Sequence, residues 1–237
     1  MKILMKALRL LWASPLGLAK VVVVPGVLAL ILVGLWVWSP RAVGNGDVLV
    51  FVAPGLIVIV CIFWAAAAWH RFVLLDGVVG WLPSVPLPAL LRFVGFWVGM
   101  LVAGLMIGLF IGRVMMGVVG TLPSSMSYIV RLVIGAIMFW ALFLRLSPAI
   151  VGAALGRPVG LVRAWDLTAP LAGSLGVATV VIYAISEAVS IVTNIFVGSS
   201  YMVQFALWGM AWTLVFTLVT SVMTVTYGVA VQRRSLD

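Results

Sequence analysis

The sequence predicts an all-α, polytopic helical membrane protein of about six transmembrane helices, preceded by an amphipathic N-terminal interfacial helix. Hydrophobic residues make up 65% of the chain and charged residues only 8%, whereas a soluble domain is about one quarter charged. The apolar residues form long runs, and the charges stand singly or in pairs at the ends of those runs. We therefore expect residues 1–237 to form a single integral membrane domain.

Residues 1–20 (MKILMKALRLLWASPLGLAK) have the pattern of an amphipathic interfacial helix. Lys2, Lys6 and Arg9 fall within about 60° of one another on a helical wheel, and leucines and methionines occupy the remaining surface. Pro15 is expected to break this helix before the first long apolar run begins.

Six apolar segments follow, each long enough to cross about 30 Å of hydrocarbon. With both termini on one side of the membrane, that side collects eleven Lys and Arg residues, and the other collects three, Arg41, Arg113 and Arg131. The positive-inside rule then places both termini in the cytoplasm, in a bacterial inner membrane. The predicted spans are residues 21–38, 48–69, 93–112, 127–145, 171–195 and 204–229.

Two long cytoplasmic connections, residues 72–92 and 145–170, each contain three prolines, which forbid a continuous helix. A short piece with a basic residue precedes an outward span three times, as MKALRLLW, PALLRFVGFW and GLVRAWDL. This pattern suggests a three-hairpin internal repeat. A membrane protein built from unrelated hairpins would give the same pattern.

The net charge of +9 does not indicate nucleic-acid binding, because the basic residues are dispersed and form no aromatic-basic cluster. Cys61 is the single cysteine and His70 the single histidine, so the sequence supplies neither a disulfide framework nor a set of metal ligands. It contains no GxxxxGK[ST] phosphate-binding loop. We therefore expect no enzymatic activity, no catalytic residue, no cofactor and no metal.

The third predicted span carries glycines at intervals of four or five residues, which favours close approach of another helix. One interpretation is packing against a neighbouring span of the same chain, and the other is a face for a dimer or a partner subunit. The glycines are Gly95, Gly99, Gly104, Gly108 and Gly112.

Glu187 is the only acidic residue inside a predicted span, and Arg131 is expected at a similar depth near the outer end of another. An intramembrane pair of these two residues would neutralise both charges and connect two helices. The alternatives are exposure of Glu187 near the outer interface, or a role in moving a proton or a substrate.

A cytoplasmic collar of mostly basic residues is expected where the spans leave the membrane. Such a collar could bind anionic lipid head groups or the acidic surface of a partner, although ordinary anchoring at the interface explains it equally well. Within it, His70 is expected to anchor a turn at the head groups, and Asp166 to pair with Arg163 three residues earlier. The members are His70, Arg71, Arg145, Arg157, Arg163 and Asp166.

Two blocks, AWHRFVLL at residues 68–75 and FLRLSPAIVGAALGRPVGLVRAWDLT at residues 143–168, resemble blocks of a group of uncharacterised multi-span inner-membrane proteins of alphaproteobacteria. The resemblance implies a helical inner-membrane protein and no known reaction. It carries over to His70, Arg71, Arg145, Ser147, Arg157, Trp165 and Thr168.

The leading functional hypothesis is a non-enzymatic membrane protein that acts by association, as an accessory or assembly subunit of a larger inner-membrane complex or as a homo-oligomer. The alternative is a small transporter or channel for a hydrophobic or anionic solute, lined by Glu187 and the cytoplasmic arginines. A third hypothesis is a lipid-binding or scramblase-like protein.

Overall fold

The computed structural model describes residues 1–37, 48–75, 84–119, 142–195 and 201–235, and these residues are almost entirely helical, with no β-strand among them. Four of the described helices are long and apolar enough to cross a membrane, or five if the bent pair at the N-terminus counts as one span. The predicted all-α class and the presence of helices long and apolar enough to span a membrane are thus confirmed. The predicted span 127–145 lies mostly outside the described residues, so the total of six stays a prediction.

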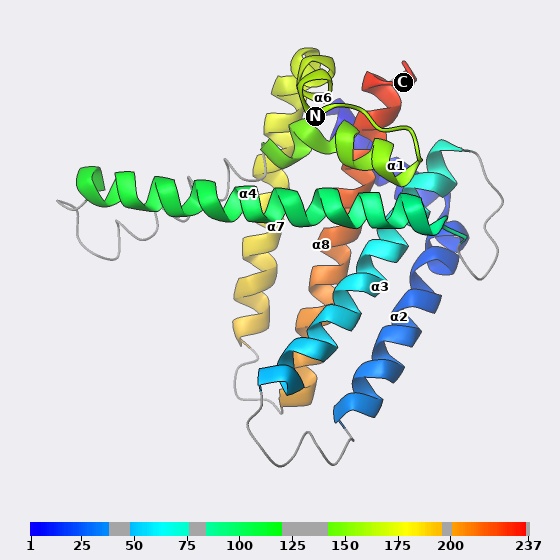
Figure 1. The fold of residues 1–237 in the computed structure, drawn as a ribbon, viewed down its shortest axis with the longest axis vertical. Helices are drawn as coiled ribbons and strands as arrows, with labels where there is room; N and C mark the ends of the chain where they lie inside the picture. Colours follow the sequence, from blue (N-terminus) through cyan, green and yellow to red (C-terminus); the bar gives the residue numbers. More distant parts are fainter. Residues whose placement is uncertain (38–47, 76–83, 120–141, 196–200, 236–237) are drawn as a thin grey trace.

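Two helical hairpins form a bundle (Figure 1). In the first, α2 (Pro15–Val37) runs antiparallel to α3 (Val48–Leu74), and in the second, α7 (Ala172–Ile195) runs antiparallel to α8 (Tyr201–Ala230). The hairpins meet where α3 packs against α8. Both chain termini lie at the same end of this bundle, which we call the terminus end.

The N-terminal helix α1 (Lys2–Ala13) turns through 81° into α2, so the predicted break at Pro15 is present. The helix is amphipathic, with exposed Lys2 and Arg9 opposite the fully buried Ile3 and Ala7. An interfacial helix would turn its apolar face toward lipid. The apolar face of α1 instead contacts α7 and α8. The reason is that the upper turns of α8 offer a large apolar surface at the same level, including Met223 and Tyr227.

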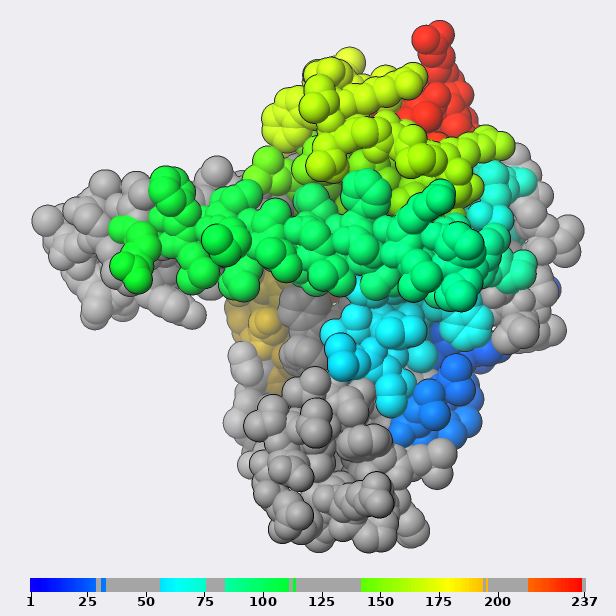
Figure 2. All heavy atoms as spheres, viewed as in Figure 1, coloured from blue at the N-terminus to red at the C-terminus, as the bar shows by residue number. Residues whose placement is uncertain are grey.

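The helix α4 (Leu87–Val119) begins directly after Pro86, whose carbonyl accepts hydrogen bonds from the backbone of Ala89 and Leu90. Pro88 lies in the first turn, where the absence of an N–H costs nothing. The PALLRFVGFW piece is therefore the first part of α4. The repeat hypothesis had assumed that it was a separate interfacial segment. α4 runs transverse to the other long helices and extends beyond the bundle (Figures 1 and 2).

Residues 142–171 build the rest of the terminus end. The helix Leu142–Ala154 passes through Pro148 but ends before Pro158, so residues 145–170 do not form one continuous helix, as predicted. It ends at Gly156, which has φ = 73°, and the Arg157 N–H returns to the Gly152 carbonyl at 2.8 Å. This is a Schellman-type stop. A short helix α6 (Leu161–Thr168) and a 3-10 turn η2 (Ala169–Leu171) then lead into α7.

Substitution of Gly152 tests the closeness of this stop. A β-carbon at Gly152 would lie 2.6 Å from the Arg157 carbonyl oxygen, whereas one at Gly176 on α7 would meet nothing within 4 Å. We expect Gly152→Ala to lower the free energy of unfolding by about 1–3 kcal/mol through overpacking against the backbone. Gly176→Ala should leave it unchanged or raise it slightly. Denaturant titration in mixed micelles measures both, and equal effects would contradict the packing.

Candidate functional site

Arginines at the terminus end bind the carbonyl ends of helices. The Arg71 guanidinium donates to the carbonyl of Ala154, the last residue of its helix, at 3.3 Å. Arg234, from the segment after α8, donates to the carbonyls of Val73 and Leu74 at 3.2 Å each. The last carbonyls of a helix lack intrahelical partners and carry its negative dipole end, so a cation is the best available donor.

Arg145 connects two helices in the same way. Its Nη2 donates to the Trp165 carbonyl in the last turn of α6 at 2.9 Å, and its guanidinium carbon lies 3.5 Å from the centroid of the Trp165 ring. The fully buried Thr168 hydroxyl lies 3.0 Å from the Arg145 carbonyl and 2.9 Å from that of Ala164. Arg145 and Thr168 thus fix α6 against the helix Leu142–Ala154.

The same helix shows how its internal proline is accommodated. Pro148 has no N–H to donate to the Leu144 carbonyl, four residues earlier. The Ser147 hydroxyl donates to that carbonyl instead, at 2.7 Å, and the Ser147 side chain is fully buried. A buried carbonyl without a partner is costly in an apolar environment, so this one side chain makes Pro148 compatible with the helix.

His70 lies in the core and not at the head groups, so its predicted membership of a hydrated collar is wrong. Its side chain is 0% exposed, its ring meets Phe93 of α4 edge to face at 5.7 Å, and Nδ1 lies 2.8 Å from the Thr224 hydroxyl of α8. The single Thr224 hydroxyl hydrogen points to the Thr220 carbonyl at 2.7 Å. Nδ1 must therefore carry the hydrogen and donate it, and His70 joins α3, α4 and α8.

An aromatic cluster continues below His70 at the junction of α3, α4 and α8. The Trp97 ring lies 4.4 Å from that of Phe143 and 5.8 Å from that of Phe216. His70 Nε2 and Trp97 Nε1 are buried without a hydrogen-bond partner among the described residues. Because the His70 side chain is fully buried and contacts Phe93 of α4 and Thr224 of α8, we assign it a structural role.

Several hydroxyl side chains on α7 and α8 are buried, and the sequence analysis did not single them out. On α7 they recur every seven residues, and each donates to the carbonyl four residues earlier, so their polar atoms are satisfied within the helix. The spacing in the sequence was a usable signal, since seven residues return to the same helix face. They are Thr179, Ser186 and Thr193 on α7, and Thr220, Ser221, Thr224 and Thr226 on α8. The Ser221 hydroxyl has no hydrogen-bond partner among the described residues.

The glycines of α4 are not packed against the rest of the described chain. A β-carbon at Gly95, Gly99 or Gly108 would meet nothing within 4 Å, and Gly104 is only partly buried. The interpretation that these glycines pack against a neighbouring span is wrong at those three positions for the part of the chain that the structure describes. Gly112 lies on the same helix.

Two charged pairs were predicted, Glu187 with Arg131 and Asp166 with Arg163, and the structure describes both residues of the second pair only. Arg131 lies outside the described residues, so its pairing with Glu187 stays a prediction. Within α7, Tyr183 lies one helical turn before Glu187, on the same side of the helix. Asp166 and Arg163 are both exposed on α6, and no ion pair joins them in the described chain, so that predicted pair is wrong. Arg157 is exposed as well.

Among the described residues, no group of three or more His, Cys, Asp or Glu side chains could hold a metal ion. Comparisons with protein-family models, with curated proteins and with solved structures find no match to this chain. The arrangement is therefore interpreted from its own geometry, which offers firm helix connections at the terminus end and one largely unpacked helix, α4.

A double-mutant cycle tests whether the Ser147 hydroxyl replaces the backbone donor that Pro148 lacks. Ser147→Ala should lower the free energy of unfolding by about 1–3 kcal/mol, because the Leu144 carbonyl loses its donor. In a Pro148→Ala background the backbone N–H returns, and the same change should cost much less. Unfolding in mixed micelles measures both, and equal costs in the two backgrounds would refute the role of Ser147.

A second cycle tests the His70–Thr224 hydrogen bond. Thr224→Val keeps the shape of the side chain and removes the acceptor, so it should cost about 1–3 kcal/mol of stability. The combined His70→Leu and Thr224→Val variant should cost less than the sum of the single changes, because neither unpaired polar group remains. Strict additivity would show that the two side chains do not interact.

Proposed function

We propose that this chain is a non-enzymatic integral protein of a bacterial inner membrane, with cytoplasmic termini, that acts by association through α4 as an accessory or assembly subunit. The observation that carries the proposal is the exposure of α4. Its first turns are attached to the bundle by buried Ala89, Phe93 and Trp97, but from Leu101 to Phe110 the structure describes no buried side chain.

The exposed part of α4 is apolar on all sides. Figure 2 shows the helix lying uncovered along one face of the molecule, and its large side chains are well exposed, among them Leu101, Leu105, Leu109 and Phe110. A helix that is apolar all round is normally buried. In Figure 1, α4 runs transverse to α2, α3, α7 and α8 and extends beyond them.

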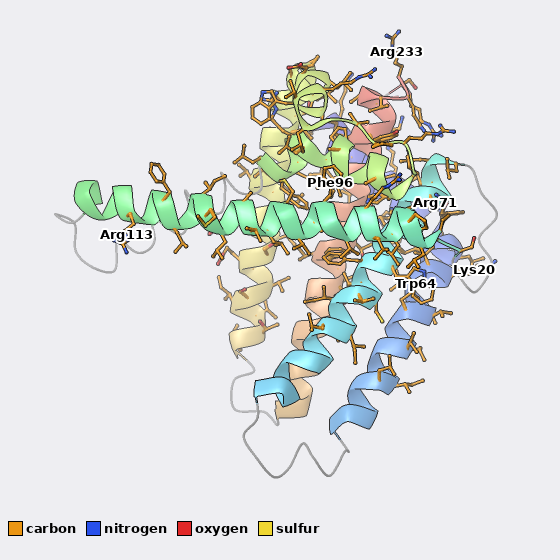
Figure 3. The ribbon with its side chains drawn as sticks, viewed as in Figure 1. Lys20, Trp64, Arg71, Phe96, Arg113 and Arg233 are labelled. Carbon is orange, nitrogen blue, oxygen red and sulfur yellow. The ribbon has the colours of Figure 1, made fainter. Side chains whose placement is uncertain are left out.

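The glycines favour a protein as the missing neighbour. Gly95, Gly99 and Gly108 leave the backbone of α4 open, and lipid tails gain nothing from such a surface, whereas another helix can approach it closely. The exposed Arg113 lies at the protruding end of α4, far from Arg71 and Arg233 at the terminus end (Figure 3). The surface for a partner therefore differs from the surface that holds the bundle together.

Site-specific photocrosslinking in native membranes tests this proposal. A photoreactive residue at Leu105 of α4 should capture a protein of defined mass, and one at the comparably exposed Val180 of α7 should capture far less. Gly99→Leu should weaken the capture at Leu105 by about 1–3 kcal/mol of association free energy, because it overpacks the helix contact.

Gly173→Leu is the matched control, since Gly173 on α7 is equally open and lies away from α4. A captured mass of twice the chain would identify the partner as a second copy. Capture of lipid alone at Leu105, in membranes that contain all native partners, would overturn the proposal.

A further inference from the structure

The short helix α6 turns an apolar surface outward. Leu161 is 48% exposed, Val162 77% and Trp165 38%, whereas Ala164 and Thr168 on the adjoining face of the helix are fully buried. At about 100° per residue, the three exposed apolar side chains lie within an arc of about 100°. A helix at a water-facing end of a protein would turn charged or polar side chains outward instead.

Charged residues border this apolar arc. Arg163 is exposed on α6, and Arg157 is exposed in the segment directly before it. Asp166, also exposed, is the one acid of the helix and lies between the apolar arc and Arg163 on the helical wheel. The surroundings are therefore positive overall, with Arg145 adding a third cation above the Trp165 ring.

The arc is held in a fixed orientation. Arg145 both stacks on the Trp165 ring and donates to the Trp165 carbonyl at 2.9 Å, and the buried Thr168 hydroxyl lies 3.0 Å from the Arg145 carbonyl. α6 lies at the terminus end, beyond the described ends of α2 and α3 (Figure 1). Tryptophan side chains prefer the boundary between lipid tails and head groups, where one edge of the ring is apolar and the other is wet.

We propose that α6 lies in the membrane interface at the terminus end and binds anionic phospholipid head groups. Leu161, Val162 and Trp165 enter the boundary between head groups and acyl chains, while Arg157 and Arg163 contact lipid phosphates. This surface is separate from α4, and the inference does not depend on the proposed association function.

Spin-label accessibility in vesicles tests the location of α6. The full-length protein with Cys61→Ala carries a nitroxide at Val162→Cys, in vesicles of phosphatidylcholine with or without phosphatidylglycerol. A label at Ser235→Cys, on the exposed C-terminal segment, is the control. We expect the Val162 label to be shielded from a water-soluble relaxing agent and accessible to oxygen, and the Ser235 label to show the reverse. Equal water accessibility of the two labels would overturn the proposal.

The same label distinguishes lipid from protein. Spin–spin broadening at Val162 would show that a second copy covers α6, which would also overturn the proposal.

The role of the arginines is tested by phosphatidylglycerol binding to the purified protein. Arg163→Gln should weaken this binding by about fivefold, and added salt should reduce the difference. Arg113→Gln removes one exposed arginine at the far end of α4 and should leave the binding unchanged. Equal losses in the two variants would show that overall charge, and not α6, attracts the lipid.

Discussion

Backbone carbonyls without a helical partner are the constraint on which the terminus end depends. Several helices end there, and each leaves carbonyls that neither lipid tails nor a dry protein interior can satisfy. The chain meets this constraint with side chains distant in sequence: Arg71 binds Ala154, Arg234 binds Val73 and Leu74, and Arg145 binds Trp165. Each contact joins the end of one helix to another segment, so satisfying the carbonyls also fixes how the helices pack.

The basic residues therefore serve two purposes. Positive charge on one side of a membrane protein is usually read as an orientation signal, and the distribution of Lys and Arg along this chain has that form. In the structure, Arg71 and Arg145 also donate hydrogen bonds to backbone carbonyls, whereas Arg157 and Arg163 are exposed. A charge count cannot separate these groups, because the difference lies in which carbonyls come within reach after folding.

The features that sequence could predict are those that depend on neighbouring residues. The all-α class and the break at Pro15 follow from composition and local backbone chemistry. Burial of His70 does not, because it depends on Thr224, 154 residues later. The place of Pro148 inside a helix has a local explanation: a serine directly before a proline can replace the missing donor, and that signal was present in the sequence. The transverse direction of α4 has no local signature.

The terminus end is tightly connected by hydrogen bonds, whereas α4 presents an exposed apolar surface, and this contrast bears on function. The two blocks of sequence that stood out, residues 68–75 and 143–168, meet in space through Arg71 and Ala154, inside the most firmly connected region. Among the described residues, the exposed part of α4 makes no comparable connection, and the helix is attached to the bundle chiefly by Phe93 and Trp97, which pack against α3 and α8. A partner on α4 could therefore bind or leave without disturbing the capped helix ends, because the contacts that hold the bundle and the surface left for association share almost no residues.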